Sequence, residues 1–257
     1  TGDIAAFPAT NAGSTPVTAT ITVTPQFTSG AVTCFGTPQT FTITVNPTPA
    51  VTDPADQVVC NGANTTAVSF SGTATSYLWT NDTPSIGLAA SGTGNIAAFP
   101  ATNAGATAVI ATITVTPRYT FGAVNCDGTA ETFTITVNPT PTVTDPADQV
   151  VCNGANTTAV TFTGAVAGTV YTWTSTNTAI GLAASGSGNI AAFPATNTGS
   201  TVISSTITVT PTFAGCNGTV QTFTITVNPT PSVTAPADQV VCNGANTTAV
   251  NFAGAVA

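Results

Sequence analysis

The chain has 257 residues, only 4% of them charged, and a net charge of −8 that arises from nine acids and a single cation, Arg118. One arginine cannot form a basic patch, so the composition excludes binding driven by nucleic-acid phosphates or by an anionic membrane surface. Hydrophobic residues make up 42% of the chain and occur in regular β-branched runs. Such runs can bury a core, which the composition of disordered chains does not allow.

Three strings recur along the chain and define a repeat. VVCNGANTTAV places cysteines at 60, 152 and 242, FTITVNPTP begins at 41, 133 and 223, and IAAFPATN begins at 4, 96 and 190. The cysteines are 92 and 90 residues apart, which suits a whole sandwich domain of about 100 residues rather than one coil of a solenoid. We therefore expect an all-β chain of tandem immunoglobulin-like (PKD-like) β-sandwich domains arranged end to end.

The repeat boundaries predict four segments. They are the C-terminal part of an incomplete repeat at 1–49, complete repeats at 50–141 and 142–231, and the N-terminal part of another incomplete repeat at 232–257. Our interpretation is an excerpt from a longer array, because a partial sandwich leaves sheet edges unpaired. The alternative is that neighbouring chains complete each other's partial domains.

Within the repeat at 50–141, a short first strand is expected at 57–60 and a second strand at 66–70. Tyr77 and Trp79 alternate on the next strand, and a tryptophan there is the usual centre of a sandwich core. Residues 85–94 should carry a short edge strand. Residues 96–102 are expected to form another, at an edge or bulge because this segment contains a proline.

Two long alternating strands close each repeat. Apolar residues at 109, 111, 113 and 115 and at 133, 135 and 137 should face inward, with threonines between them facing out. An Asn-Pro-Thr-Pro segment then ends the last strand and stiffens the link, because proline fixes φ. The predicted core residues of the two complete repeats are Trp79, Trp173, Tyr77, Tyr171, Phe133, Ile135, Phe223 and Ile225.

The ordered pattern VCNGANT, YTWT, IGL, NIAAFPATN, TITVTP, GCNG and QTFTITVNPTP resembles the PKD-like and immunoglobulin-like tandem repeats of bacterial surface proteins exported by type IX secretion. Gliding-motility adhesins belong to this group. The likeness covers essentially the whole chain. It implies an extracellular, cell-surface or filament location and an adhesive or structural role, and it identifies no ligand.

The six cysteines are regularly spaced, and without a CxxC pair or a histidine they indicate disulfides rather than a metal site. The family resemblance implies pairing within a repeat, Cys60 with Cys126 and Cys152 with Cys216. Topology suggests another pairing, because the turn after Cys60 and the hairpin of Cys216 belong to opposite ends of a sandwich, about 30 Å apart. A disulfide needs Cα atoms within about 7 Å, so the second hypothesis is a Cys60–Cys216 bond across the joint of successive repeats.

Asp53, Asp56, Asp145 and Asp148 lie in two copies of the linker motif TDPADQ. One interpretation is a calcium site at the domain joint, since calcium prefers carboxylate oxygens. The other is that these acids are turn and strand-start residues beside proline. The third copy of the motif has Ala235 in place of its first acid, which favours the second interpretation. No other cofactor is expected.

The chain lacks histidine and lysine, so it has neither the usual general base nor a Schiff-base amine, and we expect no enzyme. The expected function is a structural repeat region of a secreted cell-surface adhesin, stalk or extracellular filament. Its expected partners are neighbouring repeats and identical chains in a filament, without nucleic acid or membrane insertion. The alternatives are a module whose end loops bind a glycan or receptor, and an ice-binding surface made of the T-x-T rows.

Overall fold

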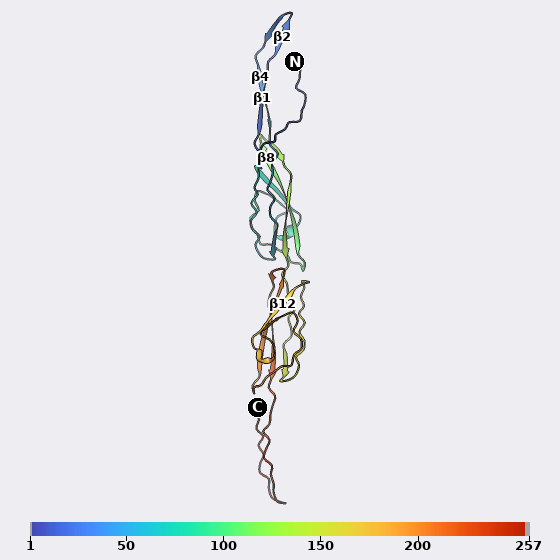
Figure 1. The fold of residues 1–257 in the computed structure, drawn as a ribbon, viewed down its shortest axis with the longest axis vertical. Helices are drawn as coiled ribbons and strands as arrows, with labels where there is room; N and C mark the ends of the chain where they lie inside the picture. The colour runs from blue at the N-terminus through green and yellow to red at the C-terminus, as the bar shows by residue number, and fades with distance from the viewer. Residues whose placement is uncertain (1, 255–257) are drawn as a thin grey trace. The chain divides into compact units, whose positions relative to one another are not determined.

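The computed structural model describes residues 2–254, and almost all of its regular structure is β-strand (Figure 1). The chain divides into two compact units, the first containing residues 1–103 and 108–137 and the second residues 104–107 and 138–257. Each unit holds one complete sandwich repeat and one partial repeat. Helical structure in the described range is limited to the single turns η1 (Pro84–Ile86) and η2 (Thr178–Ile180), and none of it is long and apolar enough to cross a membrane.

The first complete repeat is organised around a six-stranded sheet. The main path of this sheet is β5 (Gln57–Cys60), β10 (Glu131–Asn138), β8 (Val109–Phe121), β6 (Ser76–Asn81) and β7 (Ser91–Thr93), and β9 (Val124–Asp127) pairs with β8. β8 and β10 are antiparallel, with Ile113 opposite Phe133. β6 pairs with β8 as well, and places Trp79 opposite Val115. The alternating strands predicted from the sequence therefore form the centre of the sheet.

The second complete repeat has the same plan. Its strands are β11 (Gln149–Cys152), β16 (Gln221–Asn228), β14 (Ile203–Phe213), β12 (Val170–Ser175) and β13 (Ser185–Ser187), with β15 (Cys216–Asn217) paired to β14. β11 runs parallel to β16. Phe223 lies opposite Ile207, which repeats the pair formed by Phe133 and Ile113 in the first repeat.

The second layer of each sandwich is irregular, so the prediction of regular strands at 66–70 and 96–102 is wrong. These two segments meet only through isolated bridges. Side chains replace part of the ladder here, since the N–H of Phe70 donates to Oδ1 of Asn95 at 2.9 Å. Pro100 in the facing segment has no N–H to donate.

Apolar side chains from both layers form a separate core in each complete repeat. The first core contains Val68, Phe70, Trp79, Ile86, Ile96, Ile113, Val115, Phe133, Ile135 and Val137. The second contains their counterparts Val160, Phe162, Trp173, Ile180, Ile190, Ile207, Val209, Phe223, Ile225 and Val227. Tyr77 and Tyr171 are half-buried beside these cores, and their rings lie 5.5 and 5.7 Å from those of Phe70 and Phe162.

The first partial repeat, residues 2–49, contains only the second half of a sandwich. β1 (Val17–Val23) pairs antiparallel with β4 (Gln39–Val45), and β2 (Gln26–Ser29) forms a hairpin with β3 (Val32–Phe35). Together β1 and β2 correspond to the single strand β8, which continues through Pro117 because β6 pairs with it there. This partial repeat has no counterpart of β6 among its described residues, and the strand is interrupted at the equivalent proline.

The second partial repeat, residues 232–254, contains no regular strand in its described part. Several hydrogen bonds fold it back on itself. The N–H of Thr234 donates to the carbonyl of Ala253 at 2.7 Å. Gln239 accepts the N–H of Thr248 at 2.7 Å.

Candidate functional site

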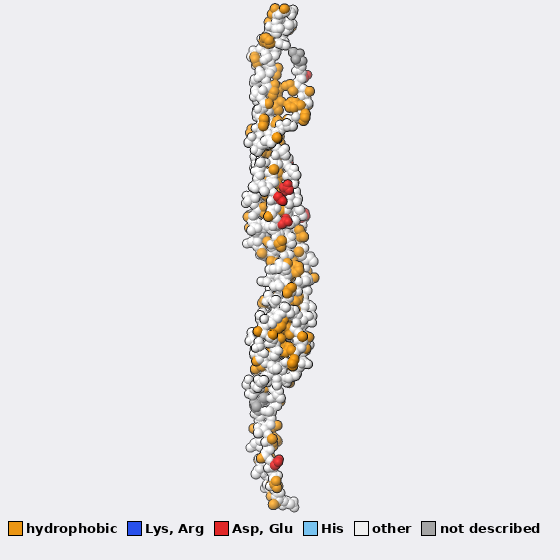
Figure 2. Space-filling model, in the orientation of Figure 1, with side chains coloured by type: hydrophobic (Ala, Val, Ile, Leu, Met, Phe, Trp, Pro, Cys, Tyr) orange, Lys and Arg blue, Asp and Glu red, His pale blue; other side chains and the backbone are white. Residues whose placement is uncertain are grey.

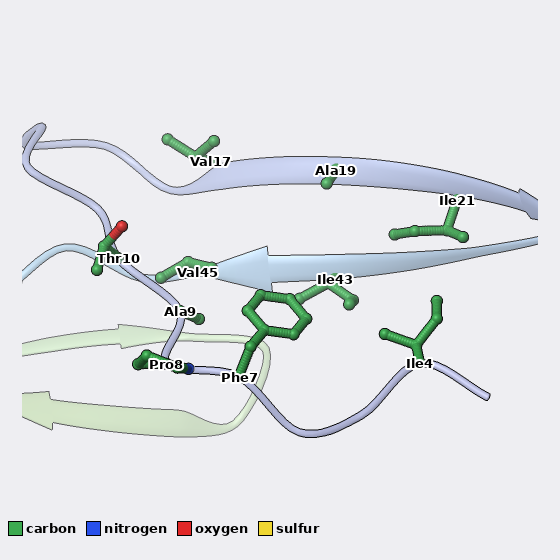
Figure 3. Close-up of a pocket in the computed structure, with 10 residues that line it drawn as sticks. All are labelled: Ile4, Phe7, Pro8, Ala9, Thr10, Val17, Ala19, Ile21, Ile43 and Val45. Atoms are coloured by element: carbon green, nitrogen blue, oxygen red, sulfur yellow. The ribbon is translucent and has the colours of Figure 1, made fainter. Parts of the chain in front are cut away.

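An apolar hollow of about 550 Å³ opens on the inner face of the first partial repeat (Figure 3). Its lining includes Ile4, Phe7 and Ala9 from the N-terminal segment and Ala19, Ile21, Ile43 and Val45 from β1 and β4. Figure 3 shows the Phe7 ring directed from the N-terminal segment toward Ile43 and Val45. Hydrophobic side chains are visible along much of the molecular surface in Figure 2.

The lining residues correspond to core residues of the complete repeats. Ile4 is 58% exposed, whereas its counterparts Ile96 and Ile190 are 3% and 4% exposed. The residues that line the hollow therefore lie on the face of the sheet that is the core side in the complete repeats. Sequence reasoning predicted the partial repeat but missed the hollow. The signal for it was the placement of predicted inward-facing residues in a segment that lacks the first half of the repeat.

Two of the four acids predicted as calcium ligands bind the protein backbone instead. Oδ1 of Asp56 accepts the N–H of Thr134 at 2.6 Å, and Oδ1 of Asp148 accepts the N–H of Thr224 at 2.6 Å. The bond from Thr134 lowers the pKa of Asp56, because it stabilises the ionised carboxylate. Each of these acids comes directly before the first strand of its repeat and anchors that strand to the last one.

The other two acids, Asp53 and Asp145, are exposed. Within residues 2–254 no three His, Cys, Asp or Glu side chains come together in a group that could hold a metal ion. Calcium binding at these linkers remains a prediction from the sequence.

The cysteines fall into two sets. Cys60 and Cys216 each take part in a disulfide. Cys34, Cys126, Cys152 and Cys242 carry free thiols. The pairings implied by the family resemblance, Cys60 with Cys126 and Cys152 with Cys216, are therefore not formed, and that expectation was wrong.

The second complete repeat gives the physical reason. Cys152 lies opposite Asn228 at the end of β16, while Cys216 lies opposite Phe213 at the far end of β14. The intervening length of β14 is about ten residues, or roughly 33 Å, far beyond the reach of a disulfide. The Cys60–Cys216 bond remains a prediction from topology, to be tested by peptide mapping.

The single cation of the chain is paired across the hairpin of β8 and β9. Nε and Nη2 of Arg118 donate to the two carboxylate oxygens of Asp127 at 2.6 and 2.9 Å. The contact lowers the pKa of Asp127 and raises that of Arg118, because the hydrogen bonds and opposite charges favour both ionised forms. An exposed pair of this kind holds a hairpin together without contributing much stability.

Sequence reasoning also missed several buried polar side chains, and the asparagine that ends IAAFPATN is the clearest case. Asn103 and Asn197 are 5% and 3% exposed. The amide nitrogen of each donates to the carbonyl of the last core valine of its repeat, Val137 or Val227, at 2.8 Å. Asn11 makes the same bond to Val45 in the partial repeat. The recurrence of this residue in all three copies of the motif was the available signal.

No protein-family model matches the sequence, and no curated protein matches it. Among solved structures, the chain is similar to the two immunoglobulin domains IG1+IG2 of DIP-gamma, with 10% identity, 71% of this chain and 98% of that one covered, and a TM-score of 0.39. It is similar to mouse cadherin-23 EC22-24, with 10% identity, 83% and 74% covered, and a TM-score of 0.33.

A further similar structure is BT4661, described as a SusE-like surface located polysaccharide binding protein from Bacteroides thetaiotaomicron. The identity is 11%, the coverage is 74% of this chain and 36% of that one, and the TM-score is 0.26. Likenesses this distant carry no argument about ligands or partners. The strand order and the two separate cores described above define an all-β protein with immunoglobulin-like sandwich repeats.

Proposed function

We propose that the chain is a structural, non-catalytic repeat region of an extracellular surface protein, acting as a stalk or filament of the kind found in type IX-secreted adhesins. The observation that carries this proposal is the pair of matching cores. The two cores share no residue, although their members correspond position by position. Repeats that each close their own core can be added in series, with stability that is roughly a sum over repeats.

The state of the cysteines supports an extracellular location. Cys60 and Cys216 are oxidised in the structure, and structural disulfides persist mainly in oxidising compartments such as the cell exterior. The sequence resemblance to exported surface repeats favours the same location.

The use of the charged side chains supports a structural role. Asp56 and Asp148 bind strand backbone, and Arg118 binds Asp127. These charged groups hold strands in place, as expected in a protein with a structural role. The same carboxylates would have to remain available to substrate in an acid–base site.

Labelling of the native protein tests this function. Antibodies raised against residues 142–231 should label threads that project from the cell surface in electron micrographs. Label confined to the cell interior would refute the proposal. A glycan array probed with the purified chain separates the adhesive alternative, since selective glycan binding by the complete repeats would favour a binding module over a stalk.

A further inference from the structure

We propose that each complete repeat bears tension through the pairing of its first and last strands, and that the aspartate directly before the first strand holds this pairing together. Asp148 is this residue in the second complete repeat, and Asp56 is its counterpart in the first. Its contact with the last strand is called here the Asp latch. The inference rests on the proposed structural role and deepens it, because it names the contacts that resist stretching of a stalk.

The order of the strands decides where a stretching force acts on a repeat. In the second complete repeat β11 is the first strand and β16 the last, and the two are neighbours in the sheet that run parallel. Tension on the two ends of the repeat therefore pulls β11 and β16 along their axes in opposite directions. The bonds of a parallel pair are evenly spaced along the strands, so this shear loads all of them together.

The segment before β11 is held less firmly. Residues 142–148 form no regular strand in the described structure. They are joined to the second layer by hydrogen bonds such as that from the N–H of Thr144 to the carbonyl of Thr163, at 2.7 Å, and that from the N–H of Ala165 to Oγ1 of Thr142, at 3.1 Å. We expect these contacts to break first and the tension to pass to β11.

The pairing of β11 with β16 is short and is extended at one end by a backbone contact. Its register aligns Gln149–Cys152 with residues 225–228. Directly after this ladder, the N–H of Asn153 donates to the carbonyl of Asn228 at 2.9 Å. A ladder of this length has few bonds to share the load, so each contact at its ends adds substantially to the total.

The Asp latch lies at the other end of the ladder. Oδ1 of Asp148 accepts the N–H of Thr224 at 2.6 Å, and these two residues directly precede the first paired residues, Gln149 and Ile225. A hydrogen bond to a carboxylate is shorter and roughly twice as strong as one between neutral groups. Because shear stretches the latch together with the ladder, the latch has to break before β11 can slide along β16.

A second side chain ties β11 to the other layer of the sandwich. The amide of Gln149 donates to the carbonyl of Thr158 at 2.9 Å and accepts the N–H of the same residue at 2.8 Å. The strand that receives the tension is therefore bonded on one side to β16 and on the other side to the second layer.

The first complete repeat contains the same contacts. β5 is the neighbour of β10 in the sheet, and Oδ1 of Asp56 accepts the N–H of Thr134 at 2.6 Å. Gln57 bonds to the backbone of Thr66 at 2.9 and 3.0 Å. The second acid of the TDPADQ motif recurs in all three copies, whereas the first acid does not. The latch accounts for this difference, since only the second acid contacts the last strand.

Constant-force stretching of single molecules of the full 257-residue chain tests the proposal, with disulfides reduced so that no covalent link resists the pull. Each complete repeat should unfold in one step, and the readout is the lifetime of each step. Asp148→Ala should shorten one lifetime by about tenfold or more, because a bond to a charged group is lost that must break to reach the transition state. Combining it with Asp56→Ala should shorten both lifetimes.

Two controls separate the latch from other effects of substitution. Asp145→Ala removes the other acid of the same motif, which is exposed, and should leave both lifetimes unchanged. Gly186→Ala crowds Trp173 at the opposite edge of the sheet, where β13 pairs with β12. It should lower the Tm and leave the lifetimes under tension unchanged, because β12 and β13 stay paired while β11 slides.

An unchanged lifetime for Asp148→Ala would overturn the proposal. So would a lifetime that falls as much in Gly186→Ala as in Asp148→Ala, because lifetime would then follow overall stability rather than the latch. An equal fall in Asp145→Ala would show an effect of charge alone, which also overturns it. Surface threads labelled by antibody would leave the stalk role standing in each of these cases.

Discussion

The buried asparagine at the end of the IAAFPATN motif offers a demanding test of how a repeat is held together. In the second complete repeat the amide nitrogen of Asn197 donates to the carbonyls of Thr201 and Val227, both at 2.8 Å. Its Oδ1 accepts the N–H of Gly199 at 3.0 Å. Asn197→Ala removes all three bonds in a site closed to water.

The expected loss follows from these contacts. Each of the three bonds contributes about 0.5–1.5 kcal/mol, which points to a total of about 3 kcal/mol. In a domain of this size about 1 kcal/mol shifts Tm by about 4–8 °C. We therefore expect the melting transition of this repeat to fall by more than about 10 °C.

Scanning calorimetry measures this effect and identifies the affected repeat. Only the transition of the second complete repeat should move, because the two cores are separate. Asn125→Ala is the control, since Asn125 is exposed and its side chain accepts a single bond from Thr120. The free energy of unfolding of the repeat that contains Asn125 should change by less than about 0.5 kcal/mol. An equally small shift for Asn197→Ala would show that water replaces the amide, and would refute the reasoning.

Three further predictions concern packing, charge and the disulfide. Gly92→Ala would press a Cβ against the indole ring of Trp79, so denaturant unfolding should show a loss of about 1–3 kcal/mol, and an unchanged midpoint would contradict the close contact. The depressed pKa of Asp56 means that its carboxylate contributes stability above the unfolded pKa of about 3.9 and loses it as the pH falls through the lower, folded-state pKa. The Tm of the unaltered chain should therefore exceed that of Asp56→Asn by less in acid than at neutral pH. A difference in Tm that does not change with pH would contradict this prediction. Non-reducing peptide mapping should yield a peptide linking Cys60 to Cys216, and a link within one repeat would exclude the topology argument.

The sheet at the centre of each repeat could be predicted because its pattern is strictly local. Alternating apolar residues such as Ile113 and Ile135 specify which face of a strand is buried, and both are fully buried. The second layer could not be predicted as well. Several of its N–H groups bond to side chains, as Phe70 does to Asn95, and residue patterns for strands say nothing of such bonds.

Contacts between residues far apart in the sequence could not be predicted either. The bond between Asp56 and the backbone of Thr134 spans 78 positions, and an acid beside proline in a linker suggests a turn or a metal ligand equally well. The topology of a sandwich, by contrast, predicts that Cys152 and Cys216 lie at opposite ends of a repeat, as they do in the structure. Knowledge of the fold was therefore more informative for the cysteines than for the acids.

Stretching single molecules tests the central claim, that each complete repeat closes its own core. With the disulfide reduced, two separate unfolding events are expected, each releasing close to 300 Å of chain for about ninety residues, less the length of the folded repeat. Destabilising the second repeat with Asn197→Ala should lower the force of one event and leave the other unchanged. A single event that releases both repeats together, or smooth extension without any event, would contradict the account.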